Sequence, residues 1–231
     1  MTREVFAWIV KASVISPLIP LILLFFYRNA QPKQNLILGV SILLSLVFDV
    51  TAWTLAQEQI SNNLIINLYF IFAFPAIMWF YHETLIKRSL KVLTRIFTIA
   101  FLVVAVIFAV NEGMDTLSFK TWMVSSILIT VTSFFFVADL NLMDASSFLN
   151  NPYHKTNIFI NTSLALYYFI TTVMFAVSDY VFAHSTREGG FAFWACHNML
   201  NVMKNIGLAV AFYMSAKASI RRGQENLHHN V

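Results

Sequence analysis

The sequence predicts an all-α membrane protein, a seven-transmembrane helix bundle with the N-terminus outside and the C-terminus in the cytoplasm. Of its 231 residues, 58% are hydrophobic and only 11% are charged, whereas a soluble domain carries roughly 25% charged residues. The apolar residues form continuous stretches rather than the short alternating segments of a membrane β-barrel. The composition therefore indicates a chain whose surface faces lipid.

Seven stretches contain the roughly 20 mostly apolar residues that a bilayer-spanning helix needs. Short polar links such as RNAQPKQ, QEQISNN and IKRSLK separate them. The first stretch is not expected to be a cleaved signal peptide, because it carries Glu4 beside Arg3, contains Lys11 and lacks a small-residue cleavage site before Arg28. In chain order, the predicted spans are Val5–Tyr27, Asn35–Ala56, Leu64–Leu85, Val92–Val110, Thr121–Leu142, Asn157–Phe182 and Phe191–Ala216.

The orientation follows from the distribution of Lys and Arg, which are enriched in cytoplasmic loops. We expect one transmembrane domain over residues 1–220 and a short cytoplasmic tail over 221–231, in a multi-pass protein of the cytoplasmic (inner) membrane. The predicted outer side has three basic residues and the inner side has ten. The outer three are Arg3, Lys120 and Arg187, and the inner ten are Arg28, Lys33, Lys87, Arg88, Lys91, Arg95, Lys155, Lys217, Arg221 and Arg222.

Polar residues inside the seventh span suggest a binding site, because polar groups are costly in a membrane and usually face the bundle interior. His197, Asn201, Lys204 and Asn205 follow one another at i, i+4, i+7 and i+8, which is one helical face. A rise of about 1.5 Å per residue places His197 in the outer third and Lys204 near the midplane. The alternative is that the imidazole and the amides only tie this span to its neighbours through interhelical hydrogen bonds.

Three further spans contribute ionisable residues to the same half of the bundle. Asp49 lies on a polar stripe of the second span at about the depth of His197. Asp179 lies near the outer end of the sixth span and could simply be solvated, and Lys11 in the first span could extend outward to the interface. We expect an outward-facing polar cavity in which Lys204 either pairs with Asp49 or is neutral. The predicted ligand-binding residues are Lys11, Asp49, Asp179, His197, Asn201 and Lys204.

A second polar group lies at the cytoplasmic ends of the third, fourth and fifth spans. It contains His82, Glu83, Arg95 and Asp139. We favour a collar of interfacial salt bridges, and the alternative is a surface that couples to a cytoplasmic signalling partner.

No residue pattern predicts an enzyme, a metal site or a nucleic-acid partner. The lone Cys196 excludes a disulfide framework and a cysteine-rich metal cluster. His82 and Glu83 begin HETLI, not the HExxH of a zinc protease. The basic residues lie between apolar runs and form no basic stripe, so nucleic acid is not an expected partner.

The patches SPLIPLILLFFY, NLYFIFAFPAIMWFYHETL and FWACHNMLNVMKNIGLA resemble an uncharacterised family of small bacterial seven-helix inner-membrane proteins. The resemblance implies a membrane sensor or an accessory signalling component. Lys204 departs from that family's pattern, in which the position is usually apolar or aromatic.

The length, the seven spans and the lysine near the middle of the seventh span are also similar to microbial opsins, and LNVMKNIG is similar to the stretch around their retinal lysine. This resemblance implies retinal as a cofactor, bound to Lys204 as a Schiff base, with Asp49 or Asp179 as the counterion. The chain lacks the acidic residue one turn before the lysine and the Arg and Asp of the family's third span.

These observations favour a non-enzymatic sensor or ligand-binding receptor for a small ligand that is not identified by the sequence. The alternatives are a retinal-binding photoreceptor or light-driven ion transporter, and a transporter of small solutes or ions. The expected partners are the lipid bilayer, the small ligand and a cytoplasmic signalling protein. The basic cytoplasmic loops would meet that protein or anionic lipid.

Overall fold

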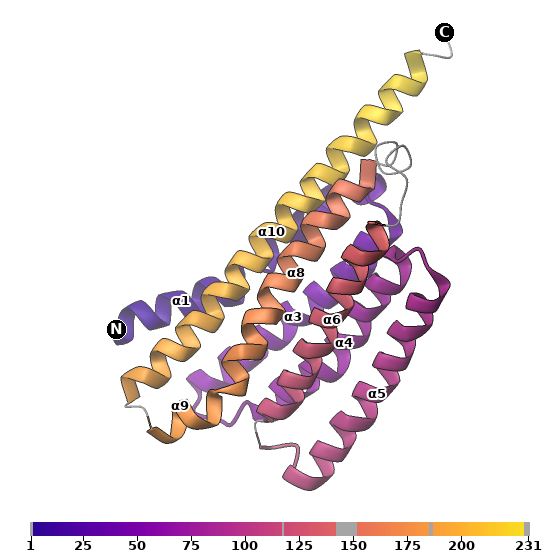
Figure 1. The fold of residues 1–231 in the computed structure, drawn as a ribbon. Helices are drawn as coiled ribbons and strands as arrows, with labels where there is room; N and C mark the ends of the chain where they lie inside the picture. Colours follow the sequence, from indigo (N-terminus) through magenta and orange to yellow (C-terminus); the bar gives the residue numbers. More distant parts are fainter. Residues whose placement is uncertain (1, 117, 142–151, 185–186, 229–231) are drawn as a thin grey trace.

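The computed structural model is helical throughout, with no strand among the residues that it describes, which are 2–116, 118–141, 152–184 and 187–228. Each predicted span is helical over most of its described residues, and Figure 1 shows the helices side by side in one bundle. The helices are α1 (Arg3–Ile15), α2 (Leu18–Phe26), α3 (Lys33–Gln57), α4 (Asn63–Thr84), α5 (Arg88–Glu112), α6 (Phe119–Leu140), α8 (Pro152–Ala176), α9 (Ser178–His184) and α10 (Arg187–His228), with a short 3-10 helix η1 at Arg28–Ala30.

The centre of the bundle is formed by α4, which packs against α3, α5 and α6. On the other side, α8 lies between α6 and α10, and α10 contacts both α1 and α2. Helix α5 packs against α4 and α6 at the edge of the bundle and is the least buried of the long apolar helices. The large buried side chains, which include Phe74, Tyr81, Phe101, Phe136 and Phe212, therefore come from several helices.

Six helices are long and apolar enough to cross a membrane by length and composition, with α1 and α2 counted together as Arg3–Phe26. The prediction of an all-helical bundle with long apolar helices is thus confirmed. Helix α10 is not among the six. Its polar face, which includes His197, Asn201, Lys204 and Asn205, lowers the hydropathy of any window long enough to span the bilayer.

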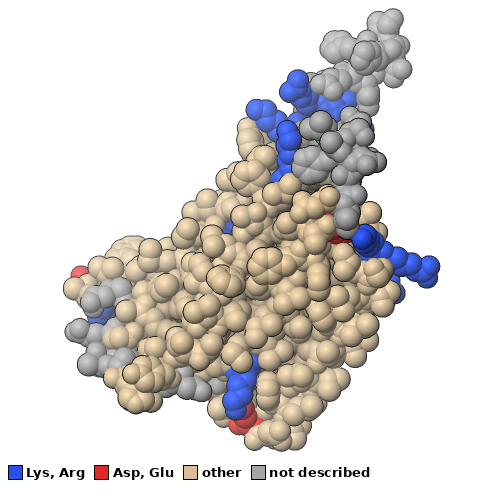
Figure 2. Space-filling model, in the orientation of Figure 1, with Lys and Arg blue, Asp and Glu red and all other residues tan. Residues whose placement is uncertain are grey.

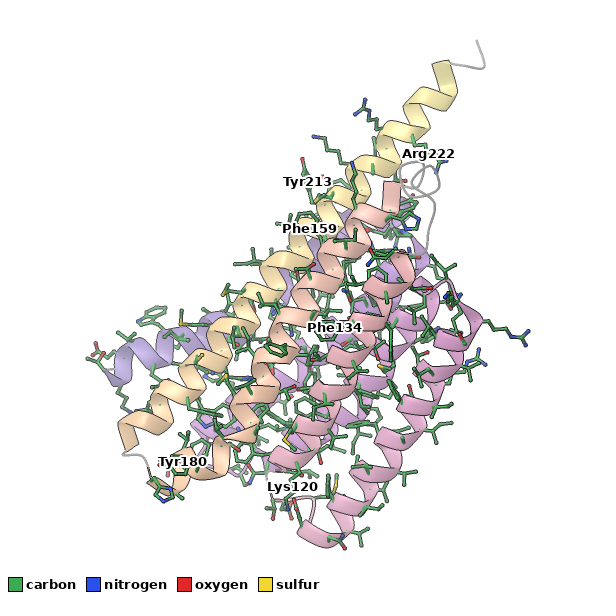
Figure 3. All side chains as sticks on the ribbon, in the orientation of Figure 1. Lys120, Phe134, Phe159, Tyr180, Tyr213 and Arg222 are labelled. Atoms are coloured by element: carbon green, nitrogen blue, oxygen red, sulfur yellow. The ribbon has the colours of Figure 1, made fainter. Side chains whose placement is uncertain are left out.

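The surface has the distribution of polarity that a bilayer requires. Large apolar side chains project outward along the middle of the bundle, as Phe134 on α6 and Phe159 on α8 do in Figure 3. Charged side chains gather mostly toward the two ends of the helices in Figure 2. In Figure 3, Lys120 and Tyr180 mark one end, and Arg222 marks the other.

The first span is not the continuous helix that we predicted. The helix ends at Ile15 and resumes at Leu18, because Pro17 has no backbone N–H and its ring blocks the preceding turn. The Ser16 hydroxyl donates to the Ser13 carbonyl oxygen at 2.8 Å, which also competes with regular helix. Figure 1 shows the result, because α1 diverges from the bundle toward the N-terminus.

The boundaries of the last two spans are also corrected. The sixth predicted span is divided at Val177 into α8 and α9. The Ser178 hydroxyl donates to the Phe175 carbonyl oxygen at 2.8 Å at this break. The seventh span and the start of the predicted tail form a single helix, since α10 continues without interruption to His228. The predicted link between the fifth and sixth spans falls largely on residues 142–151, which lie outside the described residues.

Candidate functional site

A cavity of about 210 Å³ lies at the end of the bundle that holds the N-terminus, among α1, α3, α4, α6, α8 and α10. Helix α1 forms one wall through Val10, Ser13 and Val14, and it diverges from the bundle toward the N-terminus in Figure 1. An engineered cavity of roughly 150 Å³ is enough to hold benzene. The space therefore suits a molecule of about ten non-hydrogen atoms.

Three of the predicted residues line this cavity together: Asp49 from α3, and His197 and Asn201 from α10. The Asp49 carboxylate accepts a hydrogen bond from the Ser45 hydroxyl at 3.0 Å, one turn earlier on α3. The helical spacing thus identified which side chains converge on this space.

Asn201 also has the structural role that was the alternative to ligand binding. Its side-chain amide donates to the Ser13 hydroxyl oxygen at 3.0 Å, and Asn205 donates to the Ser16 hydroxyl oxygen at 2.7 Å. These two bonds hold α10 against α1 and the turn before Pro17. They fix the position from which α1 diverges, and hence the width of the cavity.

Lys204 lies beneath the cavity rather than in it. It lines a separate void of about 10 Å³, which is about the space of one water molecule. Ser45 and Tyr69 line both spaces and separate them. Lys204 is 7% exposed, and its Nζ lies 4.5 Å from the centre of the Tyr167 ring.

Lys204 and Asp49 do not form the ion pair that was one of the two expected arrangements. Their charges are close enough to attract each other, but no ion pair within 4.0 Å joins these two described side chains. The lysine therefore offsets part of the charge of Asp49 from below and leaves the carboxylate facing the cavity.

Two other predicted residues are not part of this cavity in the structure. Lys11 is exposed on α1, and its Nζ lies 5.0 Å from the centre of the Trp8 ring, outside the cavity lining. The turn at Ser16 and Pro17 directs α1 away, which explains why helical spacing alone misplaced this residue. Asp179 belongs to α9, and its side chain lies outside the part of the chain whose side chains the structure describes.

The aromatic lining of the cavity is the part that sequence reasoning missed. Tyr69, Trp122 and Tyr167 reach it from α4, α6 and α8, and the His197 ring centre lies 5.4 Å from that of Trp122 and 5.9 Å from that of Tyr167. Trp122 lies near a predicted outer boundary, where tryptophan is common in an interfacial belt. It is instead 4% exposed.

Two polar atoms beside the cavity have no hydrogen-bond partner among the described residues. They are Nε1 of Trp122 and Nδ1 of His197. An indole N–H can only donate, and buried polar atoms are usually satisfied by protein or water. Together with the Asp49 carboxylate, these atoms give the cavity both hydrogen-bonding and ionic capacity within an aromatic enclosure.

A second polar cluster lies deeper, between α4, α6 and α8, and every member is paired. The Tyr81 hydroxyl lies 2.6 Å from the Ser133 hydroxyl and donates to Oδ1 of Asn161 at 3.0 Å. The Ser133 hydroxyl lies 3.0 Å from the Ile129 carbonyl oxygen, and its single hydrogen serves either that oxygen or the Tyr81 hydroxyl. We call Tyr81, Ser133 and Asn161 the Tyr81 cluster.

At the opposite end from the cavity, the described polar residues form one ion pair and several hydrogen bonds rather than a collar of salt bridges. Lys33 and Glu83 form an ion pair at 3.1 Å, and Asp139 accepts from the backbone N–H of Ile86 at 2.5 Å. The Asp139 carboxylate therefore fixes the turn between α4 and α5. A role in coupling to a cytoplasmic partner stays a prediction.

No group of three or more His, Cys, Asp or Glu side chains that could hold a metal ion occurs within the described ranges. No known protein family, curated protein or solved structure matches this chain. The resemblances to seven-helix inner-membrane proteins and to opsins therefore stay predictions, and the geometry of the cavity is the basis for a functional proposal.

Proposed function

We propose that this protein is a multi-pass receptor of the cytoplasmic membrane that binds a small amphipathic molecule in the cavity beside α1. In this proposal α10 is the seventh span, the N-terminus and the cavity face outward, and the C-terminus is cytoplasmic. The excess of Lys and Arg in the loops opposite the cavity supports this orientation.

The observation that carries the proposal is the convergence of the Asp49 carboxylate with Trp122 and His197 on one cavity. These side chains come from three helices. Ligand sites typically combine an apolar, aromatic lining with a few polar groups that fix the ligand's orientation. Intramembrane ionisable residues are also functional candidates by default.

The lining favours a ligand with an amine and an aromatic or apolar body. Asp49 is the acidic residue among the lining side chains, so a donor or a positive charge on the ligand is stabilised there. Aromatic faces such as those of Tyr69 and Trp122 attract cations and pack well against rings. The ligand's acceptor groups would meet Nε1 of Trp122.

The position of Lys204 favours this receptor over a retinal protein. Its amine lies under the Tyr167 ring and outside the cavity lining, whereas a Schiff-base lysine would have to reach the space that holds the chromophore. We therefore expect no lysine-dependent visible band when all-trans retinal is added to the purified protein. A band that Lys204→Ala abolishes would overturn the receptor proposal.

The binding test uses phenethylamine as the probe, with 2-phenylethanol and phenylacetate as neutral and anionic matches. Three of the five tryptophans line the cavity, namely Trp53, Trp122 and Trp194, so binding should change intrinsic fluorescence excited at wavelengths that the probes do not absorb. We expect a saturable fluorescence change with phenethylamine and a weaker one with 2-phenylethanol. In Asp49→Asn, phenethylamine should no longer bind better than the alcohol. Equal responses to all three probes, or none to any, would contradict the proposed chemistry.

A further inference from the structure

A second hollow lies far from the cavity, at the end of the bundle where the basic loops are. It has a volume of about 510 Å³ and runs between α4 and α5, and we call it the α4–α5 groove. Its polar end is formed by Trp79, His82 and Arg95, and its apolar end by Pro75 and Ile99. Nothing in the proposed receptor function uses this groove.

The polar end holds a cation with unused hydrogen-bonding capacity. Nη2 of Arg95 donates to Nε2 of His82 at 3.1 Å. With Nε2 as the acceptor, the ring hydrogen is assigned to Nδ1, which lies 3.1 Å from the Lys91 carbonyl oxygen. A guanidinium has five N–H donors, so this arrangement orients Arg95 and leaves donors for a further acceptor.

The nearest acidic residue does not cancel this charge. The Glu83 carboxylate pairs with Lys33 at 3.1 Å and accepts from Nε1 of Trp79 at 3.2 Å. Glu83 also lines the groove, but Lys33 balances its charge, whereas Arg88 and Lys91, which precede Arg95 on α5, lie outside the lining. The polar end of the groove is therefore positively charged.

In the proposed orientation the span begins at Val92, which places Arg95 about 5 Å inside the membrane boundary, where a long side chain reaches the lipid headgroups. One turn deeper, Ile99 is 64% exposed and continues the groove as an apolar surface with Pro75. The planar guanidinium suits the phosphodiester of a lipid, and the apolar end of the groove suits the acyl chain attached to it.

We propose that the α4–α5 groove binds one anionic phospholipid, with its phosphate on the Arg95 guanidinium and an acyl chain along Pro75 and Ile99. The charge of the groove selects an anionic headgroup, and its apolar end requires an attached chain. The site is separate from the cavity, so its loss would leave the binding of phenethylamine unchanged.

The test is native mass spectrometry of the full chain, purified in mild detergent and offered phosphatidylglycerol or phosphatidylcholine with identical chains. We expect one phosphatidylglycerol molecule to bind in preference to phosphatidylcholine. Arg95→Gln should lower the bound fraction about fivefold, the effect of one basic residue at an anionic interface. The matched control is Arg88→Gln, which removes the same charge from α5 outside the groove and should change binding less than twofold.

The proposal is overturned if Arg95→Gln binds phosphatidylglycerol as the unchanged protein does, if both variants lose binding equally, or if phosphatidylcholine binds as tightly. Soluble glycerophosphoglycerol has the headgroup without acyl chains, so it should compete poorly with phosphatidylglycerol for the groove. Competition as strong as that of the lipid would also overturn the proposal. Should Arg95→Gln fail to fold, Thr98→Phe fills the groove without altering charge. It should cause the same loss, and normal lipid binding by that variant would contradict the proposal.

Discussion

The cavity beside α1 and the Tyr81 cluster contain similar polar groups and share α4, α6 and α8, yet they are organised in opposite ways. In the Tyr81 cluster, the hydroxyl of Tyr81 has partners at 2.6 and 3.0 Å, and the groups around it are paired in turn. Beside the cavity, Nε1 of Trp122 and Nδ1 of His197 have no partner in the described part of the chain. The first arrangement connects helices, whereas the second leaves polar atoms available to water or to the ligand that we propose.

This difference matters because unpaired polar groups cost free energy in a low-dielectric environment. Where the protein can supply partners, as around Tyr81, the polar groups connect helices. Where it leaves polar groups unpaired around a space, a bound molecule gains by pairing with them. Similar substitutions in the cavity and in the Tyr81 cluster should therefore have different effects.

The largest effect on stability is expected from Tyr81→Phe. The change leaves Asn161 Oδ1 without the Tyr81 hydroxyl as its donor, at a cost of about 1–2 kcal/mol in the free energy of unfolding. The measurement is unfolding in detergent, monitored by circular dichroism. Tyr213→Phe makes the same change on an exposed side chain of α10 and should cost under about 0.5 kcal/mol. Equal losses in the two variants would mean that the cluster has no special role.

The second expectation concerns Asp49→Asn, which keeps the size of the side chain and removes its charge. The affinity for phenethylamine should fall by about tenfold or more, since hydrogen bonds to charged groups contribute about 1.5–3 kcal/mol. Stability should fall by no more than about 1 kcal/mol, because the neutral amide still accepts from the Ser45 hydroxyl, its hydrogen-bond partner at 3.0 Å among the described residues, and only the attraction to the buried Lys204 is lost. A variant that fails to fold would make Asp49 structural and would remove the main support for the receptor.

The third expectation compares two serines through one change. Ser133→Ala removes a partner of the Tyr81 hydroxyl and should cost about 1 kcal/mol of unfolding free energy. Ser45→Ala removes the donor to Asp49 at the base of the cavity and should cost less, while it weakens phenethylamine binding. Both serines are buried, so burial alone predicts equal costs. The reverse order in thermal unfolding would contradict the contrast between the two regions.

The smallest effect is expected from Lys11→Gln. This lysine is exposed and contacts the Trp8 ring rather than the cavity, and an exposed cation–π contact contributes about 0.5–1 kcal/mol at most. Phenethylamine affinity should stay within about twofold of the unchanged protein. A large loss of affinity would show that α1 closes over the ligand and would restore Lys11 to the site.

Hydropathy located the six helices that are long and apolar enough to cross a membrane, because a bilayer imposes a length and a composition that one sequence displays directly. It did not predict the breaks at Pro17 and Val177 or the continuation of α10 to His228. Helical spacing put His197 and Asn201 on the face of α10 that meets Asp49 at the cavity, but it also put Lys204 there, which lies outside the cavity lining. The position of Lys11 depended on the break at Pro17, whose direction is decided by packing and by the bonds from Asn201 and Asn205 to the serines of α1.

The remaining features depend on contacts between distant segments. The position of Trp122 in the sequence predicts an interfacial anchor. Its burial becomes evident only when α6 is placed against α8 and α10. The partners of Tyr81 come from Ser133 and Asn161, 52 and 80 residues away. No local pattern indicates that such residues meet, which is why the paired cluster was not predicted while the row of polar residues on α10 was.

The central claim is that the cavity is open to the outside while the Tyr81 cluster is closed, and cysteine labelling tests it most directly. In a Cys196→Ser background, Ala52→Cys places a thiol in the cavity lining, and Ser133→Cys places one in the Tyr81 cluster. A membrane-impermeant thiol reagent added to intact cells should label Ala52→Cys and leave Ser133→Cys unmodified. Labelling of neither or of both, with the proteins folded and inserted, would contradict an outward-open cavity above a sealed core.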